Sequence, residues 1–492
     1  MPDFSQPEGR LYIDGKLVEA RTGARFANVN PATEAVIGQV ADGGPEDMHA
    51  AIAAARRAFD TTSWSTDVAL RKRCLEQLQQ GLDKEKEHLR KQTVAEVGAP
   101  ILLTYGPQGD SVIRDLAWVA NLLGRYDFER DLGVHEFFGM KSRRVVRKEA
   151  TGVVGCITPW NFPLQVNLAK VGPALAGGNT IVLKPAPDTP WTATFIAKVV
   201  AEHTDIPPGV FNVVTSQDPA RVGEVLCADP RVDMLSFTGS TAVGRRIMAA
   251  GADTVKKVFL ELGGKSANIV LDDAKLEAVL PGASMVCMHG GQGCAIATRL
   301  LIPRARYAEG IAILEQAFRA VSYGDPTDPK NIQGPQINRR QQDRVLGYVE
   351  KGIQEGARVV VGGKRPAHLP KGFFVEPTLL ADVRNDMTVA QEEIFGPVLV
   401  VIPHDGDDDA VRIANDSLYG LSGMVASASE ERAFAVARRL RTGTVGVNGG
   451  MWFAPDSPFG GYKQSGVGRE MGVEGFEEYL ETKTIGLPAA KG

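Results

Sequence analysis

The sequence predicts an α/β protein with two doubly wound parallel β-sheets, each covered by helices on both faces. From residue 151 onward, short β-rich segments such as GVVGCITPW and VDMLSFTGS recur at intervals of roughly 25 to 30 residues, the length of a strand with its crossover helix. A second series follows residue 294 and includes RLLIP and GPVLVVIPHD. Because strands that alternate with helices form parallel sheets, the two series indicate two such sheets.

Helices are expected both before and within these series. Residues 46–60 carry apolar side chains at helical spacing, with Pro45 at a suitable first position, and residues 67–97 place leucines among charges that face solvent. Further helical patterns cover residues 189–203, 241–251, 305–320, 338–355 and 429–441.

Two extended segments fit neither series: residues 132–150 and the sequence YLETKTIGLP near the C-terminus. Arms of this kind often pair across subunits, which would make them an oligomerisation flap. The alternative is that they edge one of the sheets.

Composition excludes several classes of protein. The formal net charge of −4 argues against a nucleic-acid partner, and no apolar run of about 18 residues predicts a membrane span. The start, MPDFSQPEGR, lacks the pattern of a secretory signal. The five cysteines are odd in number and scattered, without the spacing of metal ligands. We therefore expect a cytoplasmic protein without a structural metal.

Two short segments raise the question of chemistry. In MHGGQGCAIATR, Cys294 follows three glycines, which we expect to let a substrate come close to the sulfur; the alternative is a small buried hydrophobe. In LSFTGSTAVG, residues 235–244, a strand ends in Thr-Gly-Ser and a helix begins. Free N–H groups there suit a pyrophosphate, although an ordinary capped helix has the same pattern.

Seven motifs occur in the order typical of one family: ITPWNFP, VLKPA, FTGSTAVG, LELGGK, GQGC followed by Arg299, EEIFGPV and SPFGGYKQSGVGRE. Over nearly its whole length the chain resembles the NAD(P)-dependent aldehyde dehydrogenases of the hydrolytic type, which do not acylate coenzyme A. The resemblance implies an aldehyde dehydrogenase-like fold.

The resemblance also implies catalytic roles. Cys294 matches the nucleophile, whose thiolate forms a thiohemiacetal and then a thioester. Asn161 matches the side chain that stabilises the oxyanion, and Glu261 matches the base that activates the hydrolytic water. Lys170 and Glu470 match a proposed proton path, the alternative being a plain ion pair.

For the cofactor, the resemblance implies a set of contacts around a dinucleotide. These residues are Trp160, Lys184, Thr238, Gly239, Ser240, Gly244, Glu393 and Phe395. One position departs from the family pattern, because Pro187 stands where NAD-preferring members usually carry Glu, and Asp188 comes one place later. NAD is favoured, and NADP stays open.

The substrate tunnel of the family is matched by six residues. They are Phe162, Val166, Ala169, Trp452, Phe453 and Phe459. The aromatic side chains suggest an apolar or aromatic aldehyde, and Ala169 occupies an often bulky position, which would widen the tunnel. The alternative is that these aromatics belong to the core.

By the same resemblance, residues 1–126 and 151–262 form the dinucleotide-binding domain, and residues 263–462 form the catalytic domain. Residues 127–150 and 478–492 form the flap of a homodimer or homotetramer.

Three alternatives stay open. A coenzyme A-acylating enzyme is disfavoured by Glu261, and a non-catalytic relative is disfavoured by the presence of Cys294 and Asn161. A cofactor-free cysteine hydrolase would need a base such as His289.

Overall fold

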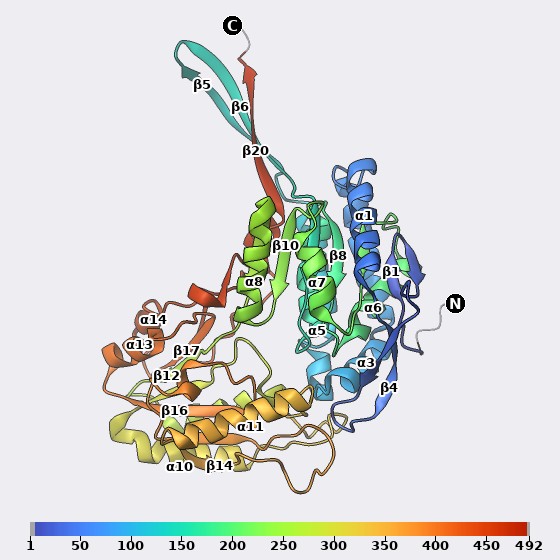
Figure 1. Cartoon of the computed structure of the whole chain (residues 1–492). Coiled ribbons are helices and arrows are strands. Elements are labelled where there is room, and N and C mark those ends of the chain that lie inside the picture. Colours follow the sequence, from blue (N-terminus) through green and yellow to red (C-terminus); the bar gives the residue numbers. More distant parts are fainter. Residues whose placement is uncertain (1–4, 490–492) are drawn as a thin grey trace.

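The computed structural model describes residues 5–489. Two helix-covered sheets form two bodies, and a long three-stranded ribbon projects from the first (Figure 1). Residues 1–4 and 490–492, the ends of the predicted first domain and flap, lie outside the described residues. Within the described range, no helix is both long and apolar enough to cross a bilayer.

The first sheet has eight strands. In spatial order they are β19 (Gly466–Val467), β11 (Lys257–Glu261), β10 (Met234–Thr238), β7 (Val153–Ile157), β8 (Thr180–Lys184), β9 (Phe211–Val213), β1 (Leu11–Ile13) and β2 (Lys16–Val18). Strands β11 to β9 are parallel, while the edge strands pair antiparallel. The short hairpin of β3 (Arg25–Val29) and β4 (Val36–Ala41) is separate.

Helices cover both faces of this sheet because successive strand residues point to opposite sides. Val153 packs into one core with α1 (Pro45–Thr61), α7 (Pro219–Ala228) and α8 (Thr241–Gly251). Val154 packs into the other core, on the opposite face. That core contains side chains of α2 (Val68–Lys84), α3 (Lys86–Val97), α4 (Asp110–Leu122), α5 (Pro163–Ala176) and α6 (Pro190–His203).

The second sheet has seven strands, of which only the edge strand β14 is antiparallel. In spatial order they are β14 (Arg358–Val361), β15 (Thr378–Ala381), β16 (Val398–His404), β13 (Arg299–Pro303), β12 (Ala267–Val270), β17 (Ser422–Ala426) and β18 (Thr444–Val447). One face carries α11 (Arg339–Gln354), α12 (Thr388–Gln391), α13 (Asp407–Asn415) and α14 (Glu430–Ala437). The other carries α9 (Leu276–Val279), the 3₁₀ segment Leu280–Gly291 and α10 (Tyr307–Arg319).

The predicted fold class is confirmed, with local differences. The single helix expected over 67–97 is two helices, because Glu85 between them leaves helical geometry at φ −102° and ψ 9°. Helices α4, α5, α7 and α13 are among those that the sequence patterns did not predict. The return of the chain as β19 beside β11 brings the SPFGGYKQSGVGRE motif to the end of that strand.

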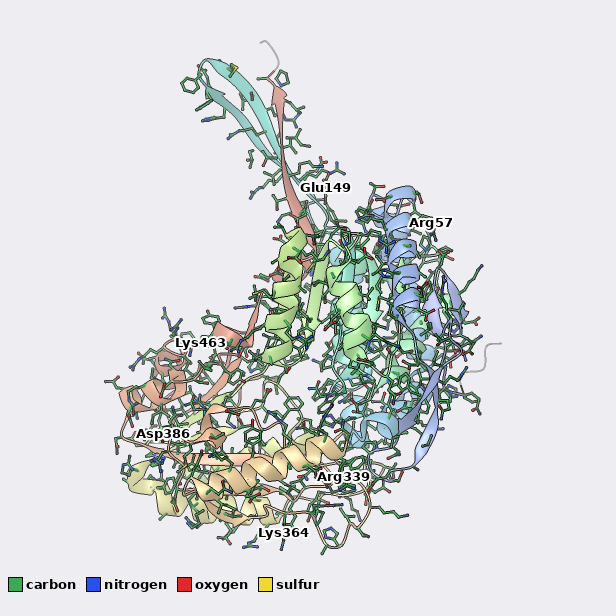
Figure 2. The ribbon with its side chains drawn as sticks, in the orientation of Figure 1. Arg57, Glu149, Arg339, Lys364, Asp386 and Lys463 are labelled. Carbon is green, nitrogen blue, oxygen red and sulfur yellow. The ribbon has the colours of Figure 1, made fainter. Side chains whose placement is uncertain are left out.

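The ribbon consists of β5 (Glu129–Phe137), β6 (Met140–Ala150) and β20 (Leu480–Pro488), in the order β20-β6-β5. We call it the flap. Its side chains stand free on both sides, and Glu149 marks its base (Figure 2). At the far end of the molecule, Arg339 at the start of α11 forms an ion pair of 3.3 Å with Glu34, which joins the two bodies.

Candidate active site

The carboxyl ends of four neighbouring parallel strands meet at one edge of the first sheet. In register, Ile157 lies beside Lys184, Phe237 beside Ile157, and Thr238 beside Glu261. This edge is where open parallel sheets bind ligands. Four of the sequence motifs therefore converge there, although they are far apart in the chain.

The loop that precedes Cys294 has an unusual backbone. His289, Gly290 and Gly291 have φ values of 54°, 64° and 72°, in the left-handed region that glycine tolerates best. A Cβ on Gly291 would lie 2.0 Å from the carbonyl oxygen of Gly396. Gly291 thus allows the loop to pack closely against the backbone of Gly396.

Asn161 is held by hydrogen bonds at its side-chain amide and at its backbone carbonyl. Its side-chain Nδ2 donates a hydrogen bond of 2.9 Å to the carbonyl of Gln292, two residues before Cys294. Its own carbonyl accepts bonds of 2.6 Å from Gln108 Nε2 and 2.7 Å from His289 Nε2. One amide hydrogen of Asn161 is therefore committed, and the second is left for another acceptor.

His289 is a buried neutral imidazole. Its Nε2 must carry the hydrogen that binds the Asn161 carbonyl, and burial lowers the pKa of the ring to about 4. Nε2 is thus engaged by this carbonyl, and the lowered pKa makes the ring a weaker base than an ordinary histidine.

Glu261 ends strand β11 with a buried carboxylate. Both of its oxygens lack a hydrogen-bond partner within residues 5–489. Burial raises its pKa well above the usual range, and the nearby Glu470 carboxylate raises it further. A Cβ on Gly460 would lie 2.6 Å from Glu261 Oε1, so this glycine provides the space that the carboxylate occupies.

Lys170 and Glu470 form a buried ion pair with an Nζ–Oε1 distance of 2.7 Å. Lys170 also donates to Ser236 Oγ at 3.1 Å, and Ser236 is 2.9 Å from the Tyr479 hydroxyl. The pair lies within electrostatic reach of Glu261, because Lys170 lowers the pKa of Glu261 and Glu470 raises it. The predicted pair is thus present, in a network that the sequence did not indicate.

Three carboxylates lie within electrostatic reach of Cys294. Burial raises the pKa of its thiol to about 12, and the charges of Glu261, Glu393 and Glu470 add to the shift. Phe162, one residue after Asn161, packs next to the cysteine loop, since a Cβ on Gly293 would lie 3.8 Å from its ring.

The Thr238-Gly239-Ser240 segment joins β10 to α8. Ser240 caps the helix by accepting a 3.4 Å bond from the Val243 N–H. The Thr238 hydroxyl is buried without a partner among the described residues, which is a suitable donor for a bound polar group. Gly244 allows α8 to pack closely, because its Cβ would lie 2.6 Å from Leu262.

Lys184 ends β8 with its amine bonded to the Pro185 carbonyl at 3.0 Å, and burial lowers its pKa to about 8. Asp188 is engaged elsewhere, since it accepts a 2.8 Å bond from Asn338 Nδ2. One of its two oxygens is therefore already bonded.

Glu393 and Phe395 belong to the loop that packs against the cysteine segment. Glu393 accepts the Gly264 N–H at 2.9 Å, and burial raises its pKa. Phe395 has a φ of 60° and meets the Trp160 ring edge-on, with centroids 5.4 Å apart. The two aromatics link the motifs PWNFP and EEIFGPV.

Three of the predicted tunnel residues form an aromatic cluster. Trp452 stacks on Phe459 at 5.5 Å, and Phe453 meets both rings at an angle. Val166 is half-buried on α5.

Next to this cluster, a cavity of about 60 Å³ opens between α4 and α5. Its lining consists of Val112, Asp115, Leu116, Trp118, Val119, Gln165, Leu168, Ala169, Pro173, Phe453, Pro455, Met471, Gly472 and Phe476. Five of these residues come from α4, the helix that sequence reasoning missed. An amphipathic pattern over 110–122 could have predicted the helix, but not that it faces α5 and a cavity.

Comparisons with known proteins agree on one family. A model described as "Aldehyde dehydrogenase family" matches residues 17–485. A 3-succinoylsemialdehyde-pyridine dehydrogenase of Pseudomonas sp. is 45% identical over 482 residues, covering 96% of this chain and 98% of that protein.

Two solved structures of aldehyde dehydrogenases are also similar to this chain. Aldehyde dehydrogenase C of Pseudomonas syringae, a mutant in complex with NAD+ and octanal, is 40% identical with a TM-score of 0.92, covering 97% of this chain and 96% of that one. An aldehyde dehydrogenase of Mycobacterium tuberculosis in complex with NAD+ is 41% identical with a TM-score of 0.94, covering 98% and 99%.

Proposed function

The chain belongs to the aldehyde dehydrogenase family, and from that premise we propose that it oxidises a bulky, largely apolar aldehyde to the carboxylic acid with NAD+. The observation that carries the proposal is the link from Asn161 Nδ2 to the Gln292 carbonyl at 2.9 Å. This bond fixes an amide donor beside the cysteine nucleophile before any substrate arrives.

Each catalytic residue then has a defined task. The Cys294 sulfur attacks the aldehyde carbon, and the oxygen becomes an anion that accepts hydrogen bonds from the Asn161 amide and the Cys294 N–H. Removal of one such donor costs about 10²–10³ in rate. A bound NAD+ would supply the hydride acceptor for that carbon. Glu261 then takes a proton from the water that cleaves the thioester.

The buried residues at the sheet edge fit a dinucleotide. The unpartnered Thr238 hydroxyl and the free N–H groups at the start of α8 suit a pyrophosphate. We assign Lys184 and Glu393 to the ribose hydroxyls. Relatives that are 40% and 41% identical bind NAD+, which supports NAD+ over NADP+ although Asp188 is engaged with Asn338.

Cavity shape supports the substrate class. The space beside Ala169 and Phe453 is lined mostly by apolar side chains, which favours an aldehyde with a bulky apolar or aromatic body. Replacement of Ala169 by Trp should fill this space. We expect kcat/KM for a naphthyl aldehyde to fall at least about tenfold, while kcat/KM for propanal changes little.

The proposal is tested by a panel of aldehydes with NAD+ or NADP+, with and without coenzyme A, followed by the absorbance of the reduced cofactor. We expect free acid as the product. Formation of an acyl-coenzyme A instead would contradict the role of Glu261, and absence of cofactor reduction with every aldehyde would contradict the proposal.

We also propose a cytoplasmic homo-oligomer. The flap carries exposed apolar side chains, among them Phe138, 87% exposed, and Met140, which suit contact with a second copy. The five cysteines are unpaired, which suits a reducing compartment. Light scattering of wild type and of a Phe138→Asp variant would test the contact, and an unchanged mass in the variant would argue against it.

A further inference from the structure

One carboxylate breaks the pattern of helix α4. Val112, Asp115, Leu116 and Val119 follow each other at helical spacing and line the cavity between α4 and α5 together. Three of the four are apolar, as a packing face requires. Asp115 is the only charged residue in the whole lining. Breaks of a local rule like this one are expected at functional positions.

The Asp115 side chain is 23% exposed, and burial raises its pKa. Its ionic neighbour within the described residues is Arg114 at 3.6 Å, whose own side chain is 74% exposed. An ion pair of that length with a solvated arginine is worth little. The carboxylate therefore faces the cavity without a strong counter-charge, which is costly for a half-buried anion.

An aromatic ring lies beside the carboxylate. Trp118 follows Asp115 by three residues on α4, so the two side chains are neighbours on the helix surface, and both line the cavity. A carboxylate and a tryptophan that line the same cavity are a combination that can attract cations, through charge and through the π-system. No Lys, Arg or His is part of the lining, so an anionic group would meet only repulsion there.

We propose that this cavity receives the far end of the aldehyde substrate and that Asp115 and Trp118 select a positively charged group there, an amine or a quaternary ammonium. The inference rests on the proposed function, because the aldehyde end must reach Cys294. The apolar wall around Ala169 and Phe453 holds the carbon body, and Asp115 supplies the counter-charge that the cation needs when it leaves water.

The test uses matched substrates. An aldehyde with a terminal trimethylammonium group is compared with its isostere, in which carbon replaces the nitrogen, over a series of chain lengths. The variants are Asp115→Asn, which keeps shape and removes charge, and Asp456→Asn. Asp456 is an exposed acid next to the lining residue Pro455 but is not part of the lining, so it controls for long-range charge effects.

In wild type we expect kcat/KM for the cationic aldehyde to exceed that for its isostere at the best length. Asp115→Asn should reduce this ratio about fivefold and leave the isostere unchanged, while Asp456→Asn should preserve the ratio. Trp118→Leu should also reduce it. Equal ratios in wild type and Asp115→Asn would overturn the inference and leave the proposed function intact. If the wild-type enzyme oxidised none of the three aldehydes (the cationic one, its isostere and propanal), both the inference and the proposed function would be overturned.

Discussion

Replacement of His289 by Leu tests whether this residue positions Asn161. The change removes the 2.7 Å bond from His289 Nε2 to the Asn161 carbonyl and leaves the 2.6 Å bond from Gln108. A neutral hydrogen bond contributes about 1 kcal/mol, and the oxyanion donor itself contributes about 2.7–4 kcal/mol. We therefore expect kcat/KM to fall about tenfold, which corresponds to about 1.4 kcal/mol and is less than the loss in Asn161→Ala.

The assay is a double-mutant cycle on the initial rate of cofactor reduction. If His289 acts through Asn161, His289→Leu should cost less than about twofold when Asn161 is already Ala. His404 is a matched control, because it is a buried histidine that contacts the Val270 carbonyl at 2.9 Å in the second sheet. His404→Leu should show no coupling to Asn161.

Additive losses in the cycle would refute the positioning role. Complete loss of activity in His289→Leu, equal to that of Cys294→Ala, would instead restore the histidine as an essential base.

Further expectations concern the same site. Cys294→Ala should abolish turnover and retain NAD+ binding by calorimetry. Glu261→Gln should accumulate an acyl-enzyme, visible as a mass increase, and normal turnover would exclude it as the base. Because the Glu470 charge raises the pKa of Glu261, Glu470→Gln should shift the acid limb of the rate profile to lower pH. The pKa of His289 falls from 6.5 to about 4 on folding, so its neutral form stabilises the fold fully above pH 6.5 and this stability is lost as pH falls toward 4. Between pH 7.5 and 5 the wild type should lose about 2 kcal/mol through this group, and denaturant unfolding of His289→Leu should lack that loss.

Much of the fold follows from local patterns. The strand ends Lys184, Thr238 and Glu261 could be placed at one sheet edge from the sequence, because parallel strands end on the same side. The break at Glu85 could not, since neither Pro nor Gly stands at this position to mark the end of a helix.

The site was less predictable where partners are distant in the chain. His289 lies 128 residues from the carbonyl that it binds. Glycine is needed at position 291 because the backbone of Gly396 leaves no space for a Cβ there. Asp115 left a weak signal, a carboxylate on an otherwise apolar face of α4, but its meaning depends on the cavity that α5 and Phe453 complete.

The carboxylates around Cys294 determine how its proton can leave. A thiol with a pKa of about 12 is protonated at neutral pH, and an ordinary glutamate would be too weak a base to take that proton. Glu261 is not ordinary, because burial and Glu470 raise its pKa, which reduces the difference between donor and acceptor. The burial and the Glu470 charge that disfavour a Cys294 thiolate therefore also raise the proton affinity of Glu261.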